Sequence, residues 1–137
     1  MTESVLHTLL REKIVRWITK NHHEGFSIYS DSENNIYTKA YTPPINSFIP
    51  DVFATGNESK KVIIGEAKAS QWDLDSEHSE NQILAYLHYC SERTNAMLVL
   101  AVPVELINYA QSLLRALKRR NDLVSVETHV INLFFLD

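Results

Sequence analysis

Three residues in the middle of the chain have the types and spacing of a hydrolytic site. Asp51 comes near the end of one predicted strand, and Glu66 and Lys68 lie on the next strand. Side chains two positions apart on a strand share a face, so Glu66 and Lys68 project the same way. If the two strands are neighbours and Asp51 takes that face, two carboxylates and an ammonium group converge.

The surroundings of Glu66 indicate a charged group that needs a partner. Glu66 follows a non-polar run over 62–65, which is typical of a buried strand. Burial of an unpaired carboxylate costs several kcal/mol or makes the group take up a proton. Lys68 can balance one negative charge, and a metal ion would balance two carboxylates better. Carboxylate oxygens and water suit Mg²⁺ or Mn²⁺, so we expect Asp51 and Glu66 to be metal ligands.

The chemistry that this arrangement permits is metal-assisted hydrolysis of a phosphodiester. A bound Mg²⁺ would lower the pKa of a water molecule and neutralise charge on the phosphate. Lys68 would orient the attacking water or stabilise the oxyanion of the transition state. Simpler roles exist for the same residues: Asp51 can accept backbone hydrogen bonds at a strand end, and Glu66 and Lys68 can form an ion pair at a sheet edge.

The elements that position these residues are predicted from the spacing of apolar side chains. We expect helices over 3–20, 76–91 and 105–117, and strands over 26–29, 36–38, 47–53, 61–68, 96–102 and 123–136. The first two strands are expected to form a hairpin. The helix over 76–91, with Ser76 or Ser79 as its cap, is expected to connect two parallel strands. This order predicts one α/β domain over residues 1–137.

The composition limits the class of protein. With 137 residues, 45% of them hydrophobic, the chain can bury one core and is too apolar for disorder. The net charge of −4 argues against a protein that merely coats nucleic acid, although a local basic patch can still contact phosphate. We expect a cytoplasmic protein without a membrane partner, because neither a signal-peptide pattern nor a spanning apolar run is present. The single cysteine, Cys90, cannot form an internal disulfide and is expected to be buried in a helix.

Pro50-Asp51 followed by Glu66-Ala67-Lys68 resembles the signature of the PD-(D/E)XK nuclease superfamily, which includes restriction endonucleases and Holliday-junction resolvases. The segment Gln82-Ile83-Leu84-Ala85-Tyr86 resembles the additional Q-x-x-x-Y motif of its exonuclease-like branch. The resemblance implies a restriction endonuclease-like αβββαβ core, a central mixed sheet flanked by helices. It also implies Mg²⁺-dependent DNA cleavage, with Asp51 and Glu66 as ligands, Lys68 and Gln82 in the catalytic site and Tyr86 on the nucleic acid.

Other residues are candidates for the same site. The superfamily often adds an acid from its first helix; Glu3 lies about 30° from the centre of the apolar stripe, and Glu12 lies on the far side but closer to the next strand. We expect Glu3, with Glu12 as the alternative. Gln82 follows Ser79 by three positions, so it can instead belong to a capping box. The basic run at the end of the third helix is a candidate phosphate contact or a complement to the helix dipole: Lys118, Arg119 and Arg120.

We therefore expect a small divalent-metal-dependent deoxyribonuclease of recombination, repair, restriction or mobile-element processing. A homodimer would let two sites face two DNA strands. The alternative is a catalytically inactive nuclease-fold module that binds nucleic acid or a partner protein, and RNA is another possible substrate. A histidine metal site is not expected, because the i, i+4 spacing is missing among these residues: His22, His23, His78 and His88.

Overall fold

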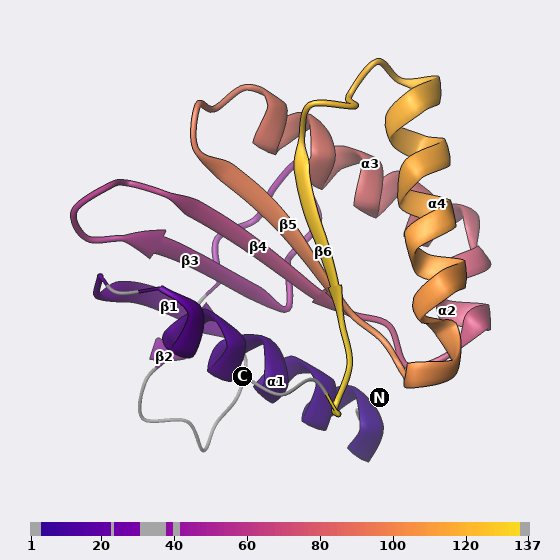
Figure 1. The fold of residues 1–137 in the computed structure, drawn as a ribbon, viewed down its shortest axis with the longest axis horizontal. Coiled ribbons are helices and arrows are strands. Elements are labelled where there is room, and N and C mark those ends of the chain that lie inside the picture. Colours follow the sequence, from indigo (N-terminus) through magenta and orange to yellow (C-terminus); the bar gives the residue numbers. More distant parts are fainter. Residues whose placement is uncertain (1–3, 23, 31–37, 40–41, 135–137) are drawn as a thin grey trace.

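The computed structural model describes residues 4–22, 24–30, 38–39 and 42–134. The strands form one sheet in the order β2-β1-β3-β4-β5-β6, flanked by helices (Figure 1). This confirms the expected α/β class with a mixed sheet. In chain order the elements are α1 (Val5–Asn21), β1 (Phe26–Ser30), β2 (Thr38–Lys39), β3 (Val52–Gly56), β4 (Val62–Ala67), α2 (Gln71–Asp75), α3 (Glu77–Ser91), β5 (Ala96–Ala101), the 3-10 helix η1 (Val104–Leu106), α4 (Ile107–Arg120) and β6 (Glu127–Ile131).

Strand β4 is the centre of the sheet, as its apolar run predicts. All six of its residues are buried, and β4 pairs antiparallel with β3 and parallel with β5. Helix α3 connects β4 to β5, which is the expected crossover between parallel strands. Strand β6 continues the parallel part of the sheet beside β5.

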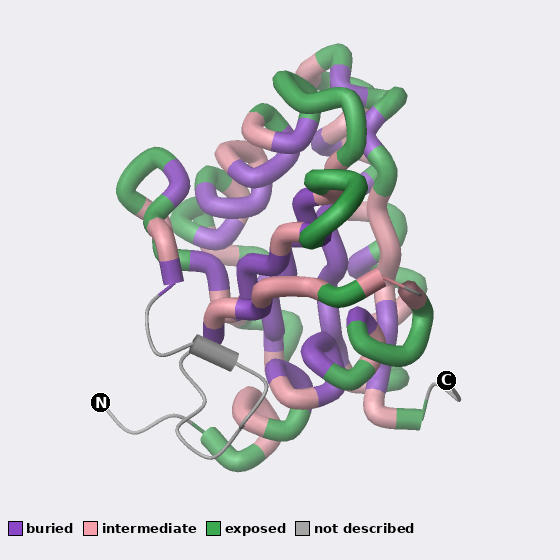
Figure 2. Tube along the Cα trace, turned by 90° about the vertical axis from the view of Figure 1, so that its left-hand side faces the viewer, coloured by how far each residue is buried: buried purple, intermediate pink, exposed green. Residues whose placement is uncertain are grey.

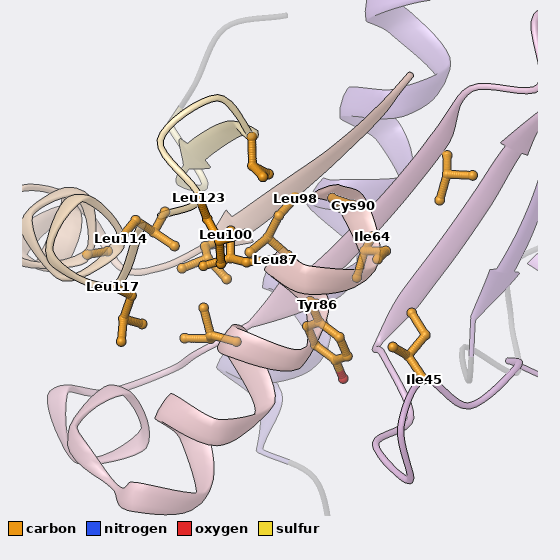
Figure 3. Close-up of a cluster of buried hydrophobic side chains, with 14 of the residues drawn as sticks. Ile45, Ile64, Tyr86, Leu87, Cys90, Leu98, Leu100, Leu114, Leu117 and Leu123 are labelled. Atoms are coloured by element: carbon orange, nitrogen blue, oxygen red, sulfur yellow. The ribbon is translucent and has the colours of Figure 1, made fainter. Parts of the chain in front are cut away.

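Two apolar clusters cover the two faces of the sheet. Ile63 packs with α1 on one face, and Ile64 packs with α3 and α4 on the other, as alternation along a strand requires. Figure 3 shows the second cluster, in which leucines of β5, α3 and α4 meet. Figure 2 shows that the buried segments run through the interior while the exposed residues lie on outer helix turns and loops.

A glycine on β4 sets the distance between the sheet and α1. A Cβ atom added to Gly65 would lie 2.6 Å from Cγ2 of Ile14 and 3.2 Å from Cβ of Val52. Real side chains do not tolerate the first of these contacts, so α1 packs this closely only because position 65 has no side chain.

The pairing of the first strands differs from the sequence prediction. The expected hairpin of 26–29 and 36–38 is wrong, because β2 pairs with β1 in parallel through Ile28 and Thr38. The antiparallel partner of β1 is β3, with five residue pairs. Local alternation identifies a strand but does not specify its neighbour, so a turn-rich stretch between two strands is weak evidence of a hairpin.

The boundaries of two strands and the presence of one helix also differ from expectation. The strand predicted over 47–53 begins only at Val52, because Asn46 and Ser47 have positive φ in a turn closed by hydrogen bonds between Ile45 and Phe48. The unexpected helix α2 is capped by the Ser70 side chain, which accepts from the Asp73 N–H. Of the strand expected over 123–136, residues 127–131 form β6, and 135–136 lie outside the described residues. No helix among the described residues is both long and apolar enough to cross a membrane.

Candidate functional site

The candidate site lies where the start of β3 meets the end of β4. Val52 pairs with Gly65 across the antiparallel ladder, so the next positions, Asp51 and Glu66, stand opposite each other. The Asp51 N–H donates to Oε1 of Glu66 at 3.3 Å, and the Ala67 N–H donates to Oδ2 of Asp51 at 2.8 Å. Each carboxylate is thus held by the backbone of the opposite segment. Asp51 does accept a backbone hydrogen bond, as its simpler role requires, but it does so directly beside a second carboxylate.

Lys68 lies just beyond β4 and turns its ammonium group into this cluster. Its Nζ is 3.9 Å from Oε2 of Glu66 and donates a hydrogen bond of 2.7 Å to Oε1 of Gln82. Glu66, Lys68 and Gln82 are all buried. The ion pair of Glu66 and Lys68 that the simpler interpretation expects is therefore present, but it lies at the end of a central strand and not at a sheet edge.

Tyr86 completes a ring of four polar side chains. The Gln82 Nε2 donates to the Tyr86 hydroxyl at 3.2 Å, and this hydroxyl donates to Oε1 of Glu66 at 3.4 Å. Tyr86 is 0% exposed, so in this arrangement its hydroxyl acts on Glu66 rather than on nucleic acid. Figure 3 shows the ring of Tyr86 leaving α3 with its hydroxyl directed away from the leucine cluster. The capping-box interpretation of Gln82 is wrong, because Ser76 caps α3.

The first helix contributes a histidine that the sequence analysis missed. Nε2 of His7 lies 3.2 Å from Oδ2 of Asp51. His7 shares a face of α1 with Leu10 and Ile14, both fully buried, so a polar residue on the apolar stripe was the signal that could have found it. The acid expected here, Glu3, lies outside the described residues. Glu12 is half-buried and follows His7 by five positions, which is more than one helical turn along α1.

The basic run at the end of α4 makes its described contacts elsewhere. Nζ of Lys118 lies 3.4 Å from Oγ1 of Thr128 on β6, and Nη2 of Arg120 lies 3.9 Å from Oε1 of Glu80 on α3. Arg119 is exposed. These described contacts do not bring the basic run together with Asp51 and Glu66.

The two carboxylates differ in their affinity for a proton. Burial raises the pKa of Glu66, and the negative charge of Asp51 raises it further, so it stays well above its usual value despite Lys68. Burial also pushes the pKa of Asp51 upward, but the hydrogen bond and charge of His7 hold it below its usual value. Burial and the charge of Glu66 raise the pKa of Tyr86, which keeps its hydroxyl a donor. Without a cation, Glu66 therefore takes up a proton more readily than Asp51 does.

The donor set fits a hard divalent cation. Among the described residues, no three His, Cys, Asp or Glu side chains gather into a metal cluster. A zinc site, which needs three or four such ligands, does not fit. Mg²⁺ commonly uses one or two carboxylates and keeps several waters, which Asp51 and Glu66 satisfy. A cation would also relieve the repulsion that raises the pKa of Glu66.

Comparisons of the chain with known protein families, with curated proteins and with solved structures give no match. The fold and the geometry of the site are therefore the features from which a function is inferred.

Proposed function

We propose that this protein is a divalent-metal-dependent nuclease of the PD-(D/E)XK type that hydrolyses DNA phosphodiester bonds. The observation that carries the proposal is the opposition of Asp51 and Glu66 on antiparallel strands, with the Lys68 ammonium 3.9 Å from Glu66. A buried pair of carboxylates stabilises no fold by itself, since each charge costs free energy to desolvate. The order of elements from α1 to β5 supports a restriction endonuclease-like core.

Each residue of the site has a defined part in this proposal. Asp51 and Glu66 would hold Mg²⁺ or Mn²⁺, which supplies charge neutralisation and a more acidic water when bound. Lys68, fixed by the Gln82 amide oxygen, is positioned to stabilise negative charge on the phosphate oxygens. His7 and the Ala67 N–H both hold Oδ2 of the Asp51 carboxylate. Tyr86 fixes Glu66.

DNA and a second copy of the chain are the proposed partners. A domain of 137 residues has little surface beyond the site with which to hold a polymer. In a symmetric dimer, two such sites would each act on one strand. Gel filtration with light scattering tests the dimer, and a monomer at all concentrations would contradict it.

The proposal is tested by assaying plasmid, linear duplex, single-stranded DNA and RNA with Mg²⁺ or Mn²⁺. Asp51→Asn keeps the shape of the side chain and removes its charge, so we expect cleavage to fall at least about a hundredfold. Glu58→Gln, in the exposed turn at the opposite end of the β3–β4 hairpin, is the matched control and should cleave normally.

Two results would contradict the proposal: cleavage that persists in Asp51→Asn, or cleavage that persists in EDTA. Nucleic-acid binding without cleavage of any substrate would instead favour the inactive nuclease-fold module.

A further inference from the structure

Large apolar side chains are exposed on segments that are close in the sequence to the residues of the candidate site. Trp72 is 84% exposed and Ile49 is 58% exposed, which is unusual for such large apolar groups. Phe48 is half-buried and packs its ring against exposed His78, with centroids 5.5 Å apart. We call these four residues, Phe48, Ile49, Trp72 and His78, the apolar rim.

The apolar rim is continuous with the site along the chain. Phe48 and Ile49 directly precede Pro50-Asp51, and His78 lies one helical turn before Gln82 on the same face of α3. Trp72 follows Lys68 by four positions, on α2. Figure 1 shows that α2 and the beginning of α3 lie toward the end of the sheet at which β4 finishes, and Lys68 directly follows β4 in the chain.

The backbone of α2, which carries Trp72, is held by buried and capping contacts. Leu74 is fully buried and anchors α2, and the Ala69 N–H donates to Oδ2 of Asp73 at 3.2 Å. The Ser70 side chain caps the same helix. Trp72 is therefore presented to solvent from a fixed backbone, which lowers the entropy lost when a planar ligand stacks on it.

The carboxylates are far less exposed than the exposed side chains of the rim, Ile49 and Trp72. Glu66 is 4% exposed, and the side chain of Asp51 is 16% exposed. A duplex keeps its bases inside and would press charged phosphates against apolar side chains. An unpaired strand can turn a phosphate toward the less exposed carboxylates and lay its bases on the rim, because each base has an apolar face that stacks on aromatic rings.

The charge around the rim favours stacking over phosphate contacts. Asp73, Asp75 and Glu77 follow Trp72 closely, and the whole chain has a net charge of −4. Such a surface does not attract phosphates, so affinity for a nucleic acid has to come from the bases. The exposed neighbours of Trp72 are polar, Gln71 and Asp75, rather than the contiguous apolar core that a protein interface needs.

From these observations, and resting on the proposed nuclease function, we propose that the apolar rim binds unpaired bases. The substrate is then a DNA strand with single-stranded character, alone or as part of a frayed or branched molecule. Because the bases supply the affinity, binding depends only weakly on salt, unlike binding that neutralises phosphates.

Tryptophan fluorescence measures this contact without requiring cleavage. The chain has two tryptophans, and Trp17→Phe leaves Trp72 as the single reporter while keeping an aromatic ring against His129. We titrate this variant in EDTA with oligothymidine, with a blunt duplex of equal length and with an abasic strand that has the same phosphates. We expect quenching by oligothymidine and little by the other two.

Substitution of the rim then measures its contribution. In the full chain, Trp72→Ala should weaken binding of oligothymidine about tenfold or more, and Trp72→Phe should weaken it less. Val124→Ala, at another exposed apolar position, is the matched control and should bind normally. The melting temperature should not change, because Trp72 is mostly exposed.

Three outcomes would overturn the inference. These are equal quenching by the abasic strand, unchanged affinity in Trp72→Ala, and dissociation of a dimer by Trp72→Ala, which would assign the rim to a second copy of the chain. The nuclease proposal fails differently, through Asp51→Asn. If the protein cleaves DNA with metal but Trp72→Ala binds DNA as tightly as the natural chain, only the inference about the rim is overturned. If Trp72→Ala weakens binding but the protein cleaves no substrate, only the nuclease proposal is overturned.

Discussion

Glu66→Gln should make the protein more stable without metal and insensitive to metal. At 3.9 Å and an effective dielectric constant of about 20, the attraction between Lys68 and Glu66 is about 4 kcal/mol. Repulsion from the adjoining Asp51 carboxylate is of the same order, so the two terms largely cancel. What remains is the cost of burying the charge. Replacing a whole buried ion pair by neutral groups stabilises proteins by about 1–4 kcal/mol, whereas removing one partner of a pair destabilises them. Because the Asp51 carboxylate remains to balance Lys68, Glu66→Gln removes the excess negative charge, and we expect a gain of about 2 kcal/mol.

These free energies convert into measurable melting temperatures. For 137 residues the entropy of unfolding is about 0.29 kcal/mol/K, so each kcal/mol shifts Tm by about 3.5 °C. Glu66→Gln should therefore melt about 7 °C above the natural chain in EDTA. With Mg²⁺ at a hundred times its Kd, the natural chain should gain about 2.7 kcal/mol, or about 9 °C. The variant should gain little, because one of its two carboxylate ligands is gone.

The pH dependence follows from the raised pKa of Glu66. A carboxyl group whose pKa is higher in the folded state binds its proton more tightly there, so its stabilising contribution is complete below the ordinary pKa of a glutamate. That contribution is lost as the pH rises through the folded-state pKa. Glutamine does not titrate, so only the natural chain loses this contribution. In EDTA, the Tm of Glu66→Gln should thus exceed that of the natural chain by a margin that grows from pH 5 to pH 8.

Thermal unfolding followed by circular dichroism, in EDTA and in Mg²⁺ across this pH range, measures both effects. Glu58→Gln, an exposed glutamate far from the site, should match the natural chain throughout. A Glu66→Gln protein that is less stable in EDTA, or that keeps the full response to Mg²⁺, would refute the reasoning.

Further expectations concern catalysis, reactivity and packing. Lys68→Met should reduce plasmid cleavage at least about a hundredfold while the Mg²⁺-induced rise in Tm persists, because Lys68 is not a ligand; loss of that rise would contradict its role. Burial raises the pKa of the Cys90 thiol to about 12, so mass spectrometry should detect alkylation by iodoacetamide at pH 8 only after denaturation. Gly65→Ala should lower Tm by roughly 3–10 °C through its clash with Ile14, whereas Gly25→Ala, which meets only the flexible end of Asn57, should cost less; equal effects would count against close packing of α1.

The central part of the fold could be predicted because its signals are local. A continuous apolar run marks β4 at 62–67, nearly as expected, and β5 and α3 follow for the same reason. The approach of Asp51 to Glu66 follows from one further assumption, that consecutive strands joined by a short turn are neighbours. Antiparallel pairing of β3 with β4 satisfies it, although Asp51 directly precedes β3 instead of lying near its end.

The parts that could not be predicted depend on contacts distant in the sequence. The residues around Phe26–Ser30 do not indicate that β3 is the antiparallel partner of β1. Pairing of strands depends instead on which of their faces must be buried together. The contact of His7 with Asp51 could not be predicted, because it depends on how α1 crosses the sheet, and the expected residue at this place was an acid. The Q-x-x-x-Y spacing likewise places Gln82 and Tyr86 on one face without stating that this face is turned inward.

Asp51 and Glu66 lie opposite each other because β3 and β4 pair as a hairpin. The number of residues between the two acids therefore does not decide whether they lie close together. Its turn at 57–60 lies at the far end from Asp51 and Glu66. Adding one residue to each strand beside that turn would lengthen the hairpin outward, and the two carboxylates would still stand opposite each other. Inserting a single residue into one strand between the turn and the acids would instead shift one of them along the ladder and reverse its face. Related chains can therefore vary widely in this spacing, provided that the growth is shared by both strands.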